Sequence, residues 1–252
     1  VYMNTTLYIN GKTVGEWKYG YTTFLFDITE FLCEGENTIL VHSVYESPNT
    51  RWYSGAGIYR DVYLIETPET HLVHDGTYIH TKELSDGRWE CNIHTEMIYE
   101  SGANTDSMPD TVEAQLRFRI LKPSVTSDMM VVSEHTLPVC SLTAQAPVQY
   151  AVLSCNPDKY ATVTDTSIIV ENPILWDIDT PFSYTLETTL SINGIVTDCQ
   201  RTCFGFRTIE LKSDSGFYLN GKHIKLNGAC MHHDLGSLGS AFNVTALRRQ
   251  FE

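Results

Sequence analysis

Polar and apolar residues alternate along most of this chain with a period of two. Between Gln115 and Ile120, for example, three polar side chains alternate with three apolar ones. Side chains of a β-strand point to opposite faces in turn, so this pattern predicts a strand with one face in water and the other in a core. Similar alternation predicts strands at residues 7–9, 38–44, 88–98, 161–170 and 184–192.

Three Asn-Gly pairs mark tight turns between such strands. They are Asn10-Gly11, Asn193-Gly194 and Asn220-Gly221, and an apolar residue precedes each of them. Both residue types tolerate the positive φ angles that a two-residue hairpin turn requires. A helical pattern is almost absent before residues 243–252, so residues 1–240 are predicted to be mainly β.

The length of 252 residues predicts more than one domain, because a compact domain usually has about 100–200 residues. A strand predicted at 62–65 is followed by a Thr-Pro-Glu-Thr stretch at 67–70, and the pattern changes again near 206–215. The block between them, residues 68–207, has the size and the roughly seven strand candidates of an immunoglobulin-like sandwich. It lacks the Cys…Trp…Cys pattern of antibody domains.

The net charge of −14 narrows the classes of partner. Nucleic acid is excluded as a partner, since phosphate binding requires clustered Lys and Arg, and an anionic membrane surface is excluded for the same reason. No apolar run approaches the ~20 residues of a membrane span, and no signal peptide is present. Because Val1 is not expected to be a native start, the location stays open between periplasmic or secreted and cytoplasmic. A neutral substrate fits this charge best.

The seven cysteines are odd in number and irregularly spaced. Cys199 and Cys203 are four residues apart, but no second pair completes a zinc pattern. We therefore predict no metal site from the cysteines and interpret them as buried free thiols.

Ordered motifs extend over nearly the whole chain. They are NGKTVG at 10–15, GYTTF at 20–24, DIT at 27–29, GEN at 35–37, RWYSGAGIYRDV at 51–62, PILWDIDTP at 173–181, YTL at 184–186, FGFR at 204–207, GFYLNGK at 216–222 and KLNGACMHHD at 225–234. Together they resemble glycoside hydrolase family 2, of the β-galactosidase and β-glucuronidase type.

The resemblance implies a mainly β architecture in three parts. Residues 1–67 are expected to be the C-terminal half of a jelly-roll sugar-binding domain, and 68–207 an immunoglobulin-like β-sandwich. Residues 208–252 are expected to be the start of a truncated (β/α)8 catalytic barrel, with its first hairpin, strand and helix start. The first half of the jelly roll is expected before Val1. Since half a sandwich exposes strand edges, another chain could cover them, and a homo-oligomer stays open.

The implied activity is retaining hydrolysis of terminal β-linked sugars. It needs two carboxyl groups, which lie about 5–5.5 Å apart in retaining enzymes. In this family both are glutamates on later barrel strands, so we assign no catalytic residue here and expect these residues alone to be inactive. A β-galactoside is favoured because it is common among such relatives; glucuronide and mannoside stay open. No cofactor is assigned, although the resemblance allows a divalent cation or sodium in the whole protein.

His232 and Asp234 are the first candidates for contact with the sugar. On a predicted strand they face one way and His233 the other. Barrel active sites form at the carboxyl ends of strands, and the resemblance implies a substrate-contacting histidine at His232. A histidine satisfied by nearby backbone is the alternative. Adjacent histidines on a strand point apart, so a metal site at 231–234 is not favoured.

Arg51 and Trp52 are the second pair of candidates, on a loop that the resemblance extends toward the active site. An arginine can donate hydrogen bonds to hydroxyls, and a tryptophan can stack on a sugar ring. A packed loop, with Arg51 paired to an acid, is the alternative, and both interpretations stand at this point. Some family members have an acidic residue near this position that contributes to a sugar and sodium site; its absence puts that site in doubt here.

Other polar and aromatic residues are interpreted as structural. Arg60 and Asp61 are expected to form a charged pair on the strand after the loop. Trp176 is expected in a core or a domain interface, and Asp177 and Asp179 are expected to cap a turn rather than act as an acid/base pair.

Two other functions compete with a glycosidase segment. A stand-alone carbohydrate-binding module would need a complete jelly roll and an exposed aromatic platform. A structural immunoglobulin-like module would explain residues 68–207 but not the motif around His232.

Overall fold

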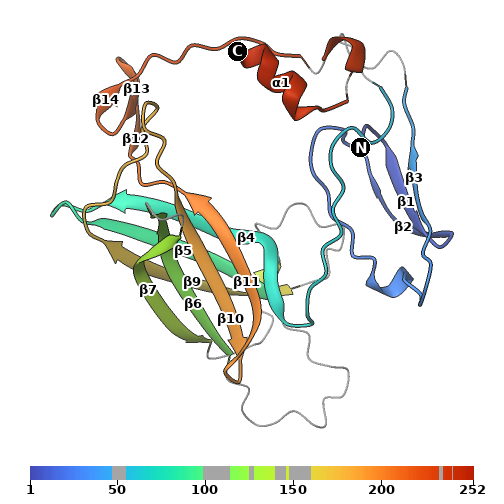
Figure 1. Cartoon of the computed structure of the whole chain (residues 1–252), viewed down its shortest axis with the longest axis horizontal. Coiled ribbons are helices and arrows are strands. Elements are labelled where there is room, and N and C mark those ends of the chain that lie inside the picture. Colours follow the sequence, from blue (N-terminus) through green and yellow to red (C-terminus); the bar gives the residue numbers. More distant parts are fainter. Residues whose placement is uncertain are drawn as a thin grey trace. The chain divides into compact units, whose positions relative to one another are not determined.

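The computed structural model describes residues 1–46, 55–98, 114–124, 128–139, 146–147, 160–232, 235–239 and 241–252. These residues form two compact units, which we describe separately. Unit 1 comprises the described parts of Val1–Ile65 and Gly228–Glu252, and unit 2 comprises those of Glu66–Ala151 and Asp158–Asn227. Strands dominate unit 2, and unit 1 contains a small sheet and one short helix, as Figure 1 shows, so the predicted mainly β fold class is confirmed.

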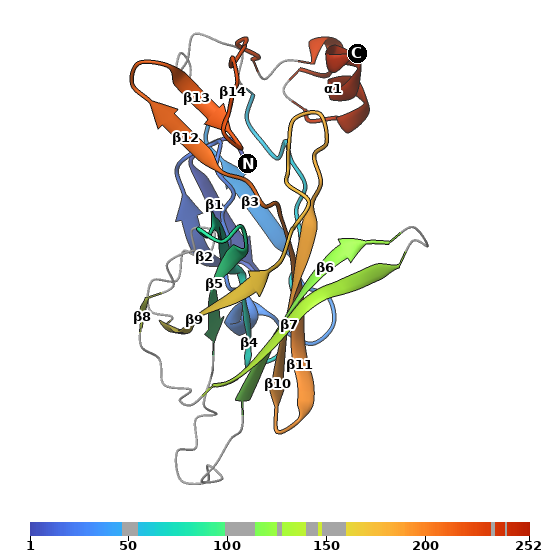
Figure 2. The ribbon, with the colours of Figure 1, turned by 90° about the vertical axis from the view of Figure 1, so that its left-hand side faces the viewer.

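Unit 2 is built on two four-stranded antiparallel sheets, with strand orders β11-β10-β6-β7 and β4-β5-β9-β8. Figure 2 gives a second view of these strands. Their bounds are β4 His71–Glu83, β5 Trp89–Ile98, β6 Ala114–Pro123, β7 Met129–Val139, β8 Ala146–Pro147, β9 Tyr160–Val170, β10 Tyr184–Ile192 and β11 Ile195–Phe204. The alternation that predicted strands at 88–98, 161–170 and 184–192 is therefore confirmed.

The buried apolar side chains of both sheets form one core. Leu116, Phe118 and Ile120 on β6 are fully buried, as the alternation predicted, and pack in the same cluster as Leu186 of β10 and Trp89 of β5. Full burial of a large apolar side chain stabilises a fold by about 1.5–3 kcal/mol. The alternating residues thus supply the core of a two-layer sandwich.

Side chains of β11 satisfy the backbone of β4 where its pairing with β5 is irregular, between Leu72 and Thr77. The Leu72 amide donates to Asp198 Oδ2 at 2.9 Å, and the Leu72 carbonyl accepts from Gln200 Nε2 at 2.9 Å. Buried backbone groups need such partners, so β11 and β4 are linked across the edges of the two sheets.

A small third sheet of unit 2 has the order β12-β13-β14, with β12 Ile209–Lys212, β13 Gly216–Leu219 and β14 Lys222–His223. The hairpin predicted at Asn220-Gly221 is confirmed. The strand predicted to end at His232 and Asp234 is wrong over its described part, since residues 225–232 form no strand. A strand requires a hydrogen-bonded neighbour, and no described strand pairs with these residues.

Unit 1 contains a three-stranded antiparallel sheet of order β2-β1-β3, with β1 Thr5–Ile9, β2 Lys12–Trp17 and β3 Ile39–Ser43. It also contains the 3-10 turns η1 Thr29–Phe31 and η2 Gly236–Leu238 and the helix α1 Val244–Phe251. The strand predicted at 62–65 is wrong: these residues form no strand and their side chains are exposed. Their apolar composition suits a strand, but no described strand pairs with them.

All three predicted Asn-Gly turns are confirmed. Asn10, Asn193 and Asn220 have φ angles of 51°, 50° and 50°, and the glycine that follows each of them also has a positive φ. These turns join β1 to β2, β10 to β11 and β13 to β14.

The cysteines differ from the prediction. Those in the described part of the chain are free thiols, but only Cys91 among them is buried, while Cys33, Cys199, Cys203 and Cys230 are exposed. Burial raises the pKa of the Cys91 thiol to about 12. Among the described helices, none is long and apolar enough to cross a bilayer.

Candidate functional site

Of the four residues predicted to contact a sugar, the structure describes His232. It is exposed and lies in unit 1, outside any strand. Arg51, Trp52 and Asp234 lie outside the described residues. The candidate site is therefore described through the segments on either side of these positions.

The segments on both sides of residues 47–54 attach to Tyr2 and its neighbours. After that stretch, Gly57 pairs with Tyr2 through two backbone hydrogen bonds of 2.9 Å. Before it, Ser43 Oγ donates to the Tyr2 carbonyl at 2.6 Å, and the Val44 amide donates to the Met3 carbonyl at 3.2 Å. The two ends of the stretch that contains Arg51 and Trp52 are thus fixed to the same few residues.

Aromatic rings add to this anchorage in what we name the tyrosine cluster: Tyr2, Tyr19, Tyr21 and Tyr45. The Tyr2 ring meets the Tyr21 ring edge-on, with centroids 5.2 Å apart, and the Tyr45 ring at 6.3 Å. The Tyr19 and Tyr21 rings are also edge-on, at 5.8 Å. Tyr2 is buried, and the other three rings are partly exposed to water.

Gly20 leaves room for the cluster. A Cβ atom added at this position would lie 2.2 Å from Cδ2 of Tyr2, so any larger residue would push the ring away. The carbonyl of Gly20 also accepts a short hydrogen bond from the Tyr59 hydroxyl. The Tyr-Gly-Tyr sequence at 19–21 is therefore a sequence signal for this cluster; the GYTTF motif contains Gly20 and Tyr21, but neither was among the predicted sugar contacts.

Two hydroxyl groups in this region, those of Tyr21 and Tyr59, have raised pKa values. Burial raises the pKa of Tyr21 above its usual value, and interactions with Tyr2 raise it further. Burial likewise raises the pKa of Tyr59, against the opposing charge of Arg60. Neutral phenols add no charge to this part of unit 1 and present apolar ring faces.

The segment that follows His232 and Asp234 meets the segment that follows Arg51 and Trp52. The Phe242 amide donates to the Tyr59 carbonyl at 3.2 Å. The turn before it is closed by the Leu235 amide, which donates to the Gly239 carbonyl at 2.9 Å. Both stretches that contain predicted sugar-contacting residues thus lead into one backbone contact within unit 1.

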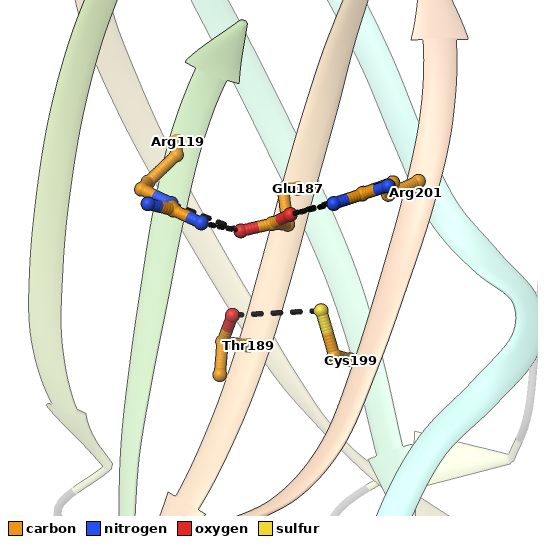
Figure 3. A network of polar contacts seen from close by, with 5 residues as sticks. All are labelled: Arg119, Glu187, Thr189, Cys199 and Arg201. Atoms are coloured by element: carbon orange, nitrogen blue, oxygen red, sulfur yellow. Dashed lines mark hydrogen bonds and ion pairs between the residues drawn. The ribbon is translucent and has the colours of Figure 1, made fainter. Parts of the chain in front are cut away.

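Unit 2 contains a buried carboxylate, that of Glu187, which is only 3% exposed. Figure 3 shows it between the guanidinium groups of Arg119 and Arg201. Arg119 donates to Oε1 from Nε at 2.9 Å and also from Nη2. Arg201 donates to Oε2 from Nε at 3.0 Å and from Nη2 at 2.8 Å. Glu134 stands opposite Arg119 on β7, so the row carries charges of alternating sign.

Glu187 has the environment of a structural ion pair. The hydrogen bond from Arg119 and the one from Arg201 hold the pKa of this carboxyl below its usual range, against the opposing effect of burial. A glycosidase acid needs a raised pKa and a second carboxyl group at a defined distance. Both oxygens of Glu187 are instead occupied by guanidinium groups, so the residue fits a structural role.

Two of the residues interpreted as structural, Asp177 and Trp176, contact neighbouring groups of unit 2. Asp177 Oδ1 accepts from the Asp179 amide at 3.3 Å, as expected of a turn cap. The Trp176 amide donates to the Phe206 carbonyl at 2.8 Å, and Arg207 lies over the Trp176 ring. The expected Arg60–Asp61 pair is not formed.

Arg60 and Asp61 each contact a tyrosine instead. Arg60 lies over the ring of Tyr59, with its Cζ atom 5.3 Å from the centroid. Asp61 Oδ2 accepts a hydrogen bond from the Tyr63 hydroxyl at 3.1 Å. Neither Arg60 nor Asp61 lies in a strand, so no strand geometry holds the two side chains together.

In the described part of the chain no three His, Cys, Asp or Glu side chains converge as metal ligands would. The divalent cation or sodium that the resemblance allows in the whole protein stays a prediction.

Two protein-family models match the chain in succession. Residues 1–68 match the sugar binding domain of glycosyl hydrolases family 2, and residues 77–207 match the glycosyl hydrolases family 2 domain. The first match contains the tyrosine cluster, and the second contains most of the sandwich.

Curated relatives and solved structures agree with these matches. The β-galactosidase BoGH2A of Bacteroides ovatus is 35% identical over all of this chain, which covers 27% of that protein. The crystal structure of a glycosyl hydrolase family 2 member from Bacteroides cellulosilyticus is 30% identical, with a TM-score of 0.78 over 100% of this chain and 29% of that one. The Bacteroides uniformis β-glucuronidase is 30% identical, with a TM-score of 0.74 over 98% of this chain and 28% of its own. The chain thus spans about a quarter of the length of the relatives it matches.

Proposed function

This chain belongs to glycosyl hydrolases family 2, and from that premise we propose that the whole protein is a retaining β-glycosidase acting on terminal β-linked sugars. The observation that carries the proposal is the succession of two family domains along the chain, residues 1–68 and 77–207. These domains would bind and orient the sugar, and the two carboxyl groups that retention requires would come from other residues of the protein.

A β-galactoside is the proposed substrate. The relative named a β-galactosidase has 35% identity to this chain, against 32% for a relative named a putative β-glucuronidase from Formosa agariphila. The net charge of −14 also favours an uncharged sugar over a uronate.

Within this chain, His232, Asp234, Arg51 and Trp52 are the residues proposed to contact the sugar. His232 and Asp234 would hydrogen-bond to hydroxyl groups, Arg51 would donate further hydrogen bonds, and Trp52 would stack on the ring. The Phe242–Tyr59 hydrogen bond supports this grouping, because it joins the segments that follow the two pairs. Residues 1–252 alone would then bind weakly and hydrolyse nothing.

The test is to express the natural protein through its barrel and to measure hydrolysis of nitrophenyl β-galactoside, β-glucuronide and β-mannoside. We expect cleavage of the galactoside, and no cleavage by residues 1–252 alone. Absence of cleavage of these and other β-glycosides, in a folded protein, would overturn the enzymatic proposal. Sugar binding without cleavage would support a carbohydrate-binding module instead.

The proposed sugar contacts have a matched test in the same protein. His232→Ala should raise KM about tenfold, the effect of about one lost hydrogen bond. His80→Ala is the control, because His80 is an exposed histidine on β4 of unit 2. Equal KM values for the two variants would remove His232 from the proposed site.

A further inference from the structure

Four Asn-Gly pairs occur in the sequence, and one of them differs from the rest in its surroundings. Asn10-Gly11, Asn193-Gly194 and Asn220-Gly221 form the hairpin turns described above. Asn227-Gly228 follows β14 along the chain, in an exposed stretch without strand or helix (Figure 1). Neither residue of this pair has a positive φ.

We propose that Asn227 is a site of spontaneous deamidation and isomerisation in the folded chain. In this reaction the backbone nitrogen of Gly228 attacks the side-chain carbonyl carbon of Asn227 and loses its proton. The side-chain amide leaves as ammonia, and a five-membered succinimide forms. Water then opens the ring at either carbonyl and gives aspartate or isoaspartate. The balance is one water consumed and one ammonia released, so no oxidant or cofactor is needed.

Ring closure requires free movement of the asparagine side chain and of the backbone on its C-terminal side. The Asn10 side-chain amide is fixed, because it donates to the Phe31 carbonyl at 2.9 Å and to Asn37 Oδ1 at 2.8 Å. Its Oδ1 accepts from the Thr38 amide at 2.9 Å. The Asn10 amide cannot reach the Gly11 nitrogen without breaking these bonds.

Asn220 is fixed in the same way. Its Oδ1 accepts from the Thr208 amide at 3.0 Å, and its Nδ2 donates to the Trp176 carbonyl at 3.0 Å. Asn193 is held by its backbone, since the turn is closed by the paired residues Ile192 and Ile195 of β10 and β11. Reaction at these pairs therefore requires local opening of a hairpin.

No such restraint acts on the fourth pair. Among the residues that the structure describes, none forms a hydrogen bond with the Asn227 side chain, and the residue is exposed. A Cβ atom added to Gly228 would meet nothing within 4 Å, so the attacking nitrogen lies in open space. Glycine also gives the backbone the freedom that ring closure needs.

The reaction would change the chain at the boundary between the two units, which falls between Asn227 and Gly228. Both products add one negative charge to a chain that already has a net charge of −14. Isoaspartate also adds one methylene to the main chain, five residues before His232. The modification would therefore alter the connection that leads to the first predicted sugar contact.

The test compares the four pairs within one sample. The 252-residue chain is incubated in mildly alkaline, ammonia-free buffer made with oxygen-18 water, once folded and once in urea, and each pair is quantified by peptide mass mapping. In urea the four pairs should react at similar rates. In the folded chain Asn227 should react nearly as fast as in urea, whereas Asn10 and Asn220 should react at least about tenfold more slowly, because they require local opening.

Two variants complete the experiment. Asn227→Gln keeps a side-chain amide but would form a larger, slower-closing ring, and it should abolish the fast incorporation of label. Gly228→Ala should slow it, because the added methyl group hinders attack by the amide nitrogen. Folded-state reaction at Asn10 or Asn220 that is as fast as at Asn227, or slow reaction at Asn227 in the folded chain, would overturn the proposal.

Discussion

β10 of unit 2 is a central strand and β3 of unit 1 is an edge strand, and each has three aliphatic residues, but the two strands differ in burial. Five consecutive residues of β10, from Leu186 to Leu190, are buried. None of the five residues of β3 is buried, and Leu40 is 58% exposed. In unit 1 the apolar residues Val62 and Leu64 are also 73% and 78% exposed.

Alternation therefore predicts a strand but not the second layer that covers it. In unit 2 the second sheet comes from the same chain, so the apolar faces cover one another. In unit 1 the described residues supply one sheet, and its cohesion comes from turns, side-chain hydrogen bonds and the tyrosine cluster. Four substitutions test this contrast, from the core of unit 2 to the helix of unit 1.

The largest effect is expected from Leu186→Ala in the core of unit 2. Truncation of a fully buried leucine removes apolar burial and leaves a cavity, which costs about 2–5 kcal/mol. Leu40→Ala is the matched control in unit 1 and should change the unfolding free energy by no more than about 0.5 kcal/mol, because the side chain is exposed. Urea unfolding followed by tryptophan fluorescence and circular dichroism measures both. Equal losses would mean that Leu40 is covered in solution and that the contrast between the units fails.

Glu187→Gln should have the next largest effect. The substitution keeps the shape of the side chain but removes the charge that pairs with Arg119 and Arg201, at a cost of about 1–3 kcal/mol. Glu134→Gln on the same row is the control, since Glu134 is exposed and a surface pair contributes at most about 1 kcal/mol. A loss no larger than that of the control would show that the triad adds nothing to the sandwich.

The unfolding free energies of wild type and Glu187→Gln should also depend differently on pH. The pKa of Glu187 is lower in the folded chain than its reference value of 4.5. Its contribution to stability is therefore fully present above that reference value and is lost as the pH falls through the folded-state pKa. Wild type should lose unfolding free energy over this acidic range, and Glu187→Gln should lose less. Parallel curves for the two proteins would contradict the assigned direction of the shift.

Gly20→Ala tests the tyrosine cluster of unit 1. The added methyl group would lie 2.2 Å from Tyr2 Cδ2 and must displace the ring, so we expect a loss of about 1–3 kcal/mol. Near-ultraviolet circular dichroism should report the changed tyrosine environment. Gly228→Ala is the control because its methyl group meets nothing within 4 Å. If both variants lose the same unfolding free energy, the packing of the Tyr2 ring does not stabilise unit 1.

The features that the sequence predicts most accurately are those that depend on residues adjacent in the chain. The hairpin turns at Asn10, Asn193 and Asn220 follow from local backbone preference, and the burial of Phe118 follows from alternation. The strand predicted at 62–65 and the one predicted to end at His232 and Asp234 failed because a strand also needs a partner, which local pattern does not provide. A run of apolar residues alone cannot indicate whether that partner lies within the chain.

The candidate site was less predictable than the fold. His232 was chosen from a motif, and the structure describes it as exposed and outside a strand. The tyrosine cluster escaped prediction because Tyr2 and Tyr45 are far apart in sequence and meet only through the pairing of β1 with β3. Glu187 escaped because its burial depends on arginines from two neighbouring strands.

The smallest effect is expected at Asn243, which caps α1. None of the described residues of this eight-residue helix is buried, so packing contributes little and the cap contributes much of its stability. Asn243 Oδ1 accepts from the Ala246 amide at 3.0 Å. Asn243→Ala should cost about 1 kcal/mol, whereas Asn243→Asp should retain the helix because aspartate caps equally well. Backbone chemical shifts of residues 244–251 measure the helical population. If Asn243→Ala leaves these shifts unchanged, other contacts hold the helix, and unit 1 depends less on local hydrogen bonds than its exposed sheet suggests.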